Sequence, residues 1–194
     1  MGIYNERDRS RVMKAVESIL DQTYDKFEFI ICDDGSEQEF YDWLKQYCKK
    51  DTRIRLLRKT QNGGLAAALN ACLAEAKGDY VARMDADDLS KPDRFERQLD
   101  FLTAHPEYAL TGCGAELIDG EGSWGKRIPA ETPQKSDFLW NSPFIHPTVI
   151  IRKNVLEELG GYVTAAYAER TEDYDLFMRM YACLLYTSDA ADER

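Results

Sequence analysis

The chain has 194 residues, enough for one α/β domain with a complete hydrophobic core and too few to predict two. Its 35 acidic and 25 basic residues give a formal net charge of -10, which disfavours binding to nucleic acid and to anionic membranes. The sequence contains no apolar run of membrane-spanning length and no recognisable export leader.

The cysteines occur without a C-x-x-C pair, at positions Cys32, Cys48, Cys72, Cys113 and Cys183. An odd number without a framework spacing is typical of reduced thiols, so we expect neither disulfides nor a zinc site. These features predict a cytoplasmic protein, and any association with the inner face of a membrane would require parts outside this sequence.

Helices and strands alternate through the first half of the chain. Apolar residues recur at helical spacing over residues 8–24, 40–48 and 65–76, with the last helix expected to close at Gly78. Strands are predicted at residues 27–32, from residue 54, and at residues 79–84. This alternation predicts an α/β fold in which a doubly wound, mostly parallel sheet carries helices on both faces.

The pattern is less regular in the second half. Ser90, followed by Pro92 and Asp93, predicts the start of a helix with apolar residues at Phe95, Leu99 and Leu102. Strands are predicted at residues 108–117 and 144–152, and residues 120–134 are predicted to form a loop. The segment TEDYDLFMRMY predicts a final helix with Thr171 as its cap.

Two of the predicted strands end in acidic turns. Asp33 and Asp34 follow one strand, and Asp85, Asp87 and Asp88 follow another. Ligands of open parallel sheets bind at the carboxyl ends of the strands, so we expect both turns to face one crevice.

Three interpretations compete for the denser turn. Its carboxylates suit a solvated helix start, because negative charge is favoured near a helix N-terminus. The spacing also matches four positions of a calcium loop, but Leu89, Ser90 and Pro92 do not suit that loop. In the third interpretation, a D-x-D pair holds Mn²⁺ or Mg²⁺, which binds the diphosphate of a nucleotide-activated substrate.

Six motifs occur in the order typical of one family. They are IYNE from Ile3, SILDQTYDKFEFIICDDGS ending at Ser36, NGGLAAALN from Asn62, GDYVARMDADD from Gly78, HPT from His146 and TEDYDL from Thr171. The ordered set resembles the family-2 glycosyltransferases of GT-A fold and extends to about Ala182. The resemblance implies an enzyme that transfers sugar from a nucleotide-diphosphate sugar, most often a UDP-sugar, to a glycan or lipid-linked acceptor with inversion.

The resemblance also implies a donor site. Tyr4, with Asp33 or Asp34, matches positions that cradle the base and ribose, whereas the alternative is that Asp34 and Gly35 only make a turn. Asp87 is expected to contact the metal directly, with Asp85 as the second candidate ligand. Asp85 or Asp88 is expected to contact the ribose or the groups that ligate the metal. His146, in the HPT motif, is expected to approach the diphosphate or the metal, and its alternative role is that of a core residue.

For the acceptor, the resemblance implies that Thr171, Glu172 and Asp173 form the T-E-D signature, in which Asp173 deprotonates the acceptor hydroxyl. The alternative is that Glu172 and Asp173 only stabilise the helix N-terminus.

Both ends depart from the family pattern. The family has further strand residues before Ile3, and CLLYTSDAADER resembles translated adapter sequence from DNA library preparation. We therefore expect an incomplete GT-A domain at residues 1–182 and a non-native tail at residues 183–194. A truncated fragment that binds nucleotide and metal without transferring sugar is the alternative function. A dinucleotide-binding role for TGCGAE is disfavoured because the third glycine of that motif is missing.

Overall fold

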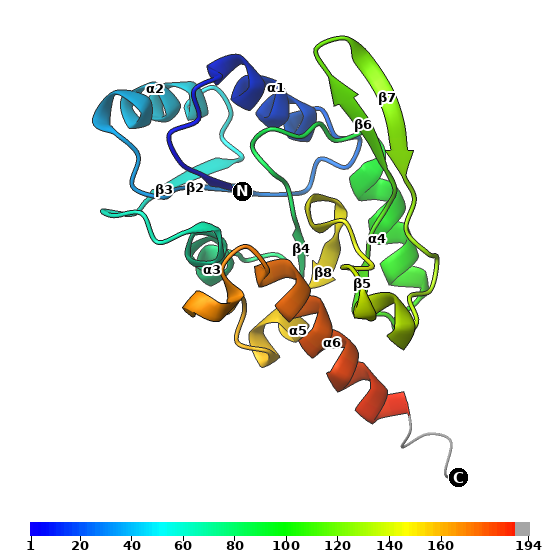
Figure 1. The fold of residues 1–194 in the computed structure, drawn as a ribbon. Helices are drawn as coiled ribbons and strands as arrows, with labels where there is room; N and C mark the ends of the chain where they lie inside the picture. The colour runs from blue at the N-terminus through cyan, green and yellow to red at the C-terminus, as the bar shows by residue number, and fades with distance from the viewer. Residues whose placement is uncertain (189–194) are drawn as a thin grey trace.

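A computed structural model describes residues 1–188 of the protein (Figure 1). A parallel sheet forms its N-terminal part. The strands β1 (Gly2–Ile3), β2 (Phe29–Asp33) and β3 (Ile54–Arg58) lie in the order β1-β2-β3. In the register, Ile3 pairs with Asp33 and Asp33 with Arg58. The carboxyl ends of β1 and β2 therefore lie side by side.

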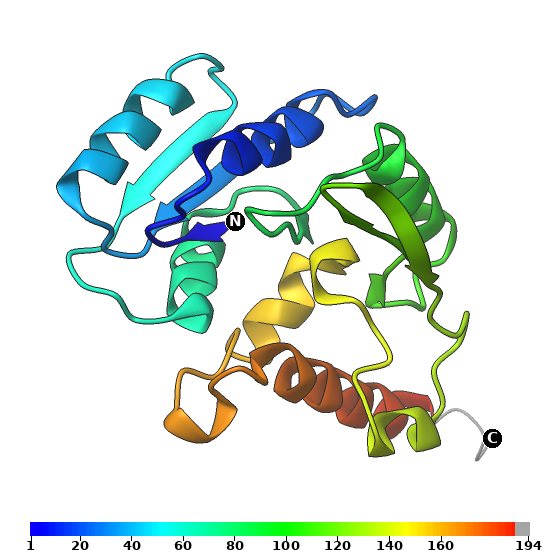
Figure 2. The same cartoon turned by 45° about the horizontal axis from the view of Figure 1, so that its top comes forward.

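Helices cover both faces of this sheet, as predicted. In both views, α1 (Arg9–Leu20) and α2 (Gln38–Cys48) lie on one side and α3 (Leu65–Glu75) on the other (Figures 1 and 2). The predicted stripe on α1 is confirmed, because Val12, Ala15, Val16 and Ile19 are buried. Asp8 caps the helix, its side chain accepting from the Arg11 amide at 3.1 Å. The third helix ends at Glu75, before the glycine expected to close it.

A second sheet combines strands that are far apart in the sequence. It consists of β4 (Tyr80–Ala82), β8 (Ile150–Arg152) and β5 (Leu110–Thr111) in the order β4-β8-β5, with both neighbours antiparallel to β8. The parallel sheet β1-β2-β3 and this antiparallel sheet together give the α/β fold, in which the strands of the first half pair in parallel as predicted. A cavity of about 390 Å³ lies between the sheets, lined by residues of β2, α3 and β4.

Several predictions for the second half were wrong. Residues 120–134 are not all loop, because β7 (Gly122–Arg127) pairs with β6 (Ala115–Asp119) in an antiparallel hairpin. Most of β7 is exposed, so its sequence lacks the apolar alternation by which a strand is recognised. The strand predicted from residue 144 begins only at Ile150, after a short 3-10 helix, η2 (His146–Thr148).

The remaining helices are α4 (Arg94–Ala104), η1 (Lys135–Leu139), α5 (Lys153–Glu158), η3 (Ala166–Ala168) and α6 (Glu172–Ser188). Helix α4 begins after Asp93, so Ser90 is not its cap; Ser90 instead contacts Gln22 and Arg94. Thr171 precedes α6 as predicted, and its carbonyl accepts from the Asp175 amide at 2.9 Å. Helix α6 runs into the segment predicted to be a tail, and residues 189–194 lie outside the described residues. Within the part described, no helix combines the length and apolar character needed to cross a membrane.

Candidate active site

The acidic turn after β2 is buried and tied to its surroundings. Asp34 is 3% exposed and accepts from Lys59 Nζ at 2.6 Å and from the amides of Gly63 and Gly64 at 3.1 and 2.8 Å. It therefore anchors the segment that leads into α3. Asp33 is fully buried, and neither of its carboxylate oxygens has a hydrogen-bond partner in the part of the chain that the structure describes. Its nearest cation is Arg58, at 3.6 Å.

Tyr4 lies next to this turn. The loop after β1 is joined to it by two hydrogen bonds, from the Asn5 amide to Ser36 Oγ and from the Glu37 amide to Asn5 Oδ1, each 2.9 Å long. Tyr4 is 51% exposed. The structure thus places Tyr4 beside the turn that carries Asp33 and Asp34, and it exposes Tyr4 rather than the carboxylates to solvent.

The acidic turn after β4 is open. Asp85 is half-buried and accepts from Arg83 Nη2 at 2.5 Å, whereas Asp87 is exposed. Asp88 is half-buried, and its pKa is raised by burial and by the negative charges of Asp85 and Asp87. The turn therefore combines an accessible carboxylate with uncompensated negative charge.

A divalent cation fits the chemistry of this turn. Carboxylate oxygens are the donors that Mg²⁺ and Mn²⁺ prefer, and Mg²⁺ commonly uses one or two of them, with waters and substrate phosphates as further ligands. Among the described residues, no group of three or more His, Cys, Asp or Glu is arranged to hold a metal ion. Asp85 and Asp87 would thus hold a cation together with further oxygen ligands, such as waters or substrate phosphates.

The start of α6 and the turn after β4 both act on Tyr162. Burial raises the pKa of Tyr162 to about 12, opposed by the charge of Arg83 and reinforced by the charges of Asp173, Asp85 and Glu172. Glu172 and Asp173 are half-buried in the first turn of α6. Carboxylates of both segments therefore oppose ionisation of the Tyr162 phenol.

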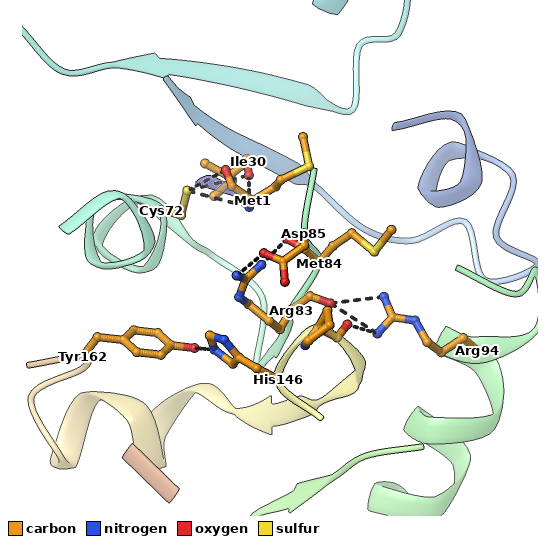
Figure 3. Close-up of polar contacts among 10 residues, drawn as sticks. Met1, Ile30, Cys72, Arg83, Met84, Asp85, Arg94, His146 and Tyr162 are labelled. Atoms are coloured by element: carbon orange, nitrogen blue, oxygen red, sulfur yellow. Dashed lines mark hydrogen bonds and ion pairs between the residues drawn. The ribbon is translucent and has the colours of Figure 1, made fainter. Parts of the chain in front are cut away.

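His146 is an internal residue of this region. It is 9% exposed, and its Nε2 lies 2.9 Å from the Tyr162 hydroxyl (Figure 3). Burial, with the positive charge of Arg83, lowers the pKa of His146 to about 2, so the imidazole is neutral.

Two arginines that sequence reasoning missed hold the site together. Arg83 is 4% exposed, and its guanidinium bonds to the Met84 carbonyl and to Asp85 (Figure 3). Arg94 of α4 donates to the carbonyls of Arg83 and Pro147, each at 3.3 Å, and burial lowers its pKa to about 10. For Arg83, the sequence offered one signal of a buried functional residue, a single arginine inside the apolar segment YVARM. Tyr162 gave no comparable signal.

Comparison with known proteins identifies the family to which this chain belongs. The model of the Glycosyl transferase family 2 domain matches residues 1–160. EpsE of Bacillus subtilis is 40% identical over 183 residues, which are 93% of this chain and 65% of EpsE. The O-antigen biosynthesis glycosyltransferase WbnJ of Escherichia coli is 32% identical, over 86% of this chain and 65% of WbnJ. The chain thus spans about two thirds of the length of these relatives.

Solved structures share the fold. The TarS 1-349 fragment of S. aureus, in complex with UDP, has a TM-score of 0.69 at 19% identity, covering 93% of this chain and 54% of that one. The mannosyltransferase PcManGT of Pyrobaculum calidifontis, in complex with GDP-Man and Mn²⁺, has a TM-score of 0.66 at 21% identity, covering 90% and 48%. The fold is therefore GT-A, and the chain belongs to glycosyl transferase family 2.

Proposed function

We propose that the protein transfers a sugar from a nucleotide-diphosphate sugar to a hydroxyl group of a glycan or lipid-linked acceptor in polysaccharide biosynthesis. The observation that carries this proposal is the open acidic turn after β4, where Asp87 is exposed and Asp85 is the carboxylate held by Arg83. That turn supplies carboxylates for the donor, and the first turn of α6 supplies Glu172 and Asp173 for the acceptor. The relative WbnJ is named for O-antigen biosynthesis, which supports a glycan product.

The donor's nucleotide would lie over the turn after β2. Tyr4 offers an exposed ring for stacking on the base, and a UDP-sugar is the donor we favour. Asp34 already accepts hydrogen bonds from Lys59, Gly63 and Gly64, so its contribution to the nucleotide would be to hold the pocket wall. In the same turn, neither carboxylate oxygen of Asp33 has a hydrogen-bond partner within the described part of the chain.

The diphosphate would lie at the turn after β4. Asp87, with Asp85, would hold Mn²⁺ or Mg²⁺, and such a cation supplies positive charge for the departing nucleoside diphosphate. Asp88 would contact the ribose or the surroundings of the cation. Arg83 limits the freedom of Asp85 by pairing with it, which leaves Asp87 the more available of the two.

Asp173 would act as the base. It would take the proton of the acceptor hydroxyl as the acceptor oxygen attacks the anomeric carbon from the face opposite the leaving group, so the configuration inverts. Glu172, beside it in the first turn of α6, would hold the acceptor or the donor sugar. A carboxylate suits this role because an inverting transfer needs one base and no protein nucleophile.

Titration with UDP tests the donor site. We expect UDP to bind more tightly with Mn²⁺ than without it, and Asp87→Ala to remove that difference. Asp93→Ala is the matched control, because Asp93 is also exposed but lies at the start of α4, paired with Arg97. Isothermal titration calorimetry measures both effects. Equal affinity of the parent protein for UDP with and without Mn²⁺ would contradict the metal assignment.

Transfer activity tests the acceptor side. In a chain extended to the full length of its relatives, Asp173→Asn should lower the transfer rate by roughly 10²–10⁴-fold while UDP affinity is retained. Asp175→Asn, in the same helical turn, controls for changes in the helix. A variant that keeps most of its activity would show that the base lies elsewhere. If the extended parent binds UDP but transfers no sugar, the alternative of a non-catalytic nucleotide-binding protein is favoured.

A further inference from the structure

Arg58, the last residue of β3, lies next to the turn that carries the two buried carboxylates. Its Nε atom lies 3.6 Å from Asp33 Oδ2, and Asp33 is fully buried. Neither carboxylate oxygen of Asp33 has a hydrogen-bond partner among the described residues. A carboxylate taken out of water needs a compensating charge, and in the described part of the chain that charge comes from Arg58.

The guanidinium of Arg58 also binds the segment after the turn. Its Nη1 donates to Gln38 Oε1 at 2.9 Å, and its Nη2 donates to the Ser36 carbonyl at 3.5 Å. Its Cζ atom lies 3.9 Å from the centroid of the Tyr41 ring, a cation–π contact with the first turn of α2. One side chain thus joins the end of β3, the turn after β2 and the start of α2.

The same segment holds the loop that carries Tyr4. Ser36 Oγ accepts from the Asn5 amide, and Asn5 Oδ1 accepts from the Glu37 amide, each at 2.9 Å. Asn5 has φ of +43, a left-handed conformation that is uncommon for a residue other than glycine. Such a conformation persists where surrounding contacts hold it. The position of Tyr4 therefore depends on residues 36 and 37.

Arginine suits this place better than lysine. A planar guanidinium can stack on the Tyr41 ring while its edge faces Asp33 and the oxygens of residues 36 and 38. A lysine ammonium is a point charge on a flexible stem, so it would balance Asp33 without holding the other groups. Charge compensation and positioning can therefore be separated by substitution of Arg58.

We propose that Arg58 is a positioning residue for the nucleotide: it balances Asp33 and fixes residues 36–38, and through them it holds Tyr4 in place to stack on the base. The part that concerns the nucleotide rests on the proposed function, whereas the charge pairing with Asp33 does not. Arg58 acts through protein groups and not through the diphosphate. Its loss should weaken recognition of the base and leave the metal-dependent part of binding unchanged.

Isothermal titration calorimetry with uridine and with UDP separates base recognition from phosphate recognition. We expect Arg58→Met to bind uridine and UDP more weakly by the same factor, roughly 5–10-fold, the loss expected for one hydrogen bond. The gain in UDP affinity caused by Mn²⁺ should be retained. Arg55→Met is the matched control, because Arg55 lies on the same strand but pairs with Glu28 and Glu75, and both affinities should stay unchanged.

Arg58→Lys keeps a positive charge beside Asp33 and guards against a Met variant that fails to fold. Its midpoint of urea denaturation should lie close to that of the parent, yet it should bind uridine more weakly than the parent does. A general loss of structure would lower both quantities together. Parent-like uridine affinity in Arg58→Lys would contradict positioning through residues 36–38.

The charge pairing is tested by urea denaturation of Arg58→Met, Asp33→Asn and the double variant. We expect Arg58→Met to cost less stability in the Asp33→Asn background than in the parent, since no buried charge then remains to be balanced. Equal losses in the two backgrounds would refute the pairing.

Three results on ligand binding would overturn the nucleotide part. Unchanged affinities in a folded Arg58→Met variant would show that Arg58 does not position the site. A loss confined to UDP, with uridine bound as in the parent, would show that Arg58 contacts the phosphates directly. If the parent binds neither uridine nor UDP, the proposed function fails and the nucleotide part fails with it, while the urea measurements still decide the pairing of Arg58 with Asp33.

Discussion

The two acidic turns have similar sequences and opposite environments. In the turn after β2, Asp33 and Asp34 are buried, and Asp34 is bonded to Lys59 and to the backbone before α3. In the turn after β4, Asp87 is exposed and Asp88 is half-buried. Only Asp85 among the three carboxylates after β4 forms an ion pair within the described residues.

This difference separates structural carboxylates from available ones. The charge of Asp34 is already balanced by a cation and by amide hydrogens, so that turn can form the wall of a nucleotide site without a metal. After β4, Asp87 and Asp88 have no such partner among the described residues, and an external cation would relieve the mutual repulsion of the carboxylates. Substitutions in the two turns should therefore act on different properties, stability in the first and ligand binding in the second.

The largest expected effect is on stability, in the first turn. Asp34→Ala leaves the Lys59 ammonium without its partner and the amides of Gly63 and Gly64 without an acceptor. We expect the free energy of unfolding to fall by about 3–5 kcal/mol, as for other broken buried ion pairs. Urea denaturation measures this loss. Asp87→Ala, in the open turn, should change stability by less than about 0.5 kcal/mol, and similar losses in the two variants would remove the distinction between the turns.

A smaller effect is expected from the glycine of the first turn. Gly35 has φ of +80, and a Cβ there would lie 2.6 Å from the backbone carbon of Gln61. Gly35→Ala should therefore lower the free energy of unfolding by about 1–3 kcal/mol, through the positive φ and the close contact. Gly64→Ala is an informative control, because its φ is +83 but no atom lies within 4 Å of the added Cβ. Equal losses would mean that φ alone, and not the close packing of the turn, sets the cost.

The smallest effect is expected in the open turn, and it depends on pH. The pKa of Asp88 is raised in the folded protein, so its ionised form opposes folding at pH 7. In metal-free buffer, Asp88→Asn should raise the free energy of unfolding by less than about 1 kcal/mol, because the side chain is partly solvated. This gain should disappear as the pH falls through the raised pKa toward the unfolded value of about 3.9. A gain that is constant with pH would show that charge repulsion is not its cause.

The sequence by itself determined the local pattern of this protein. Apolar spacing located α1, α2 and α3, since a helix that packs on one side repeats its buried residues every three or four positions. The acidic residues that follow two apolar segments also located the turns after β2 and β4. The ordered motifs indicated the family, which the family match confirms.

Tertiary structure decided which polar residues are available for binding. Nothing local distinguishes Asp34 from Asp87; Asp34 is satisfied because Lys59 and the amides before α3 fold onto it. The pairing of Tyr162 with His146 likewise depends on contacts between segments with no common periodicity, and β7 forms a strand only through its pairing with β6. Local sequence determines on which face of its helix or strand a side chain lies. Its burial and hydrogen bonding depend on residues brought from elsewhere in the chain.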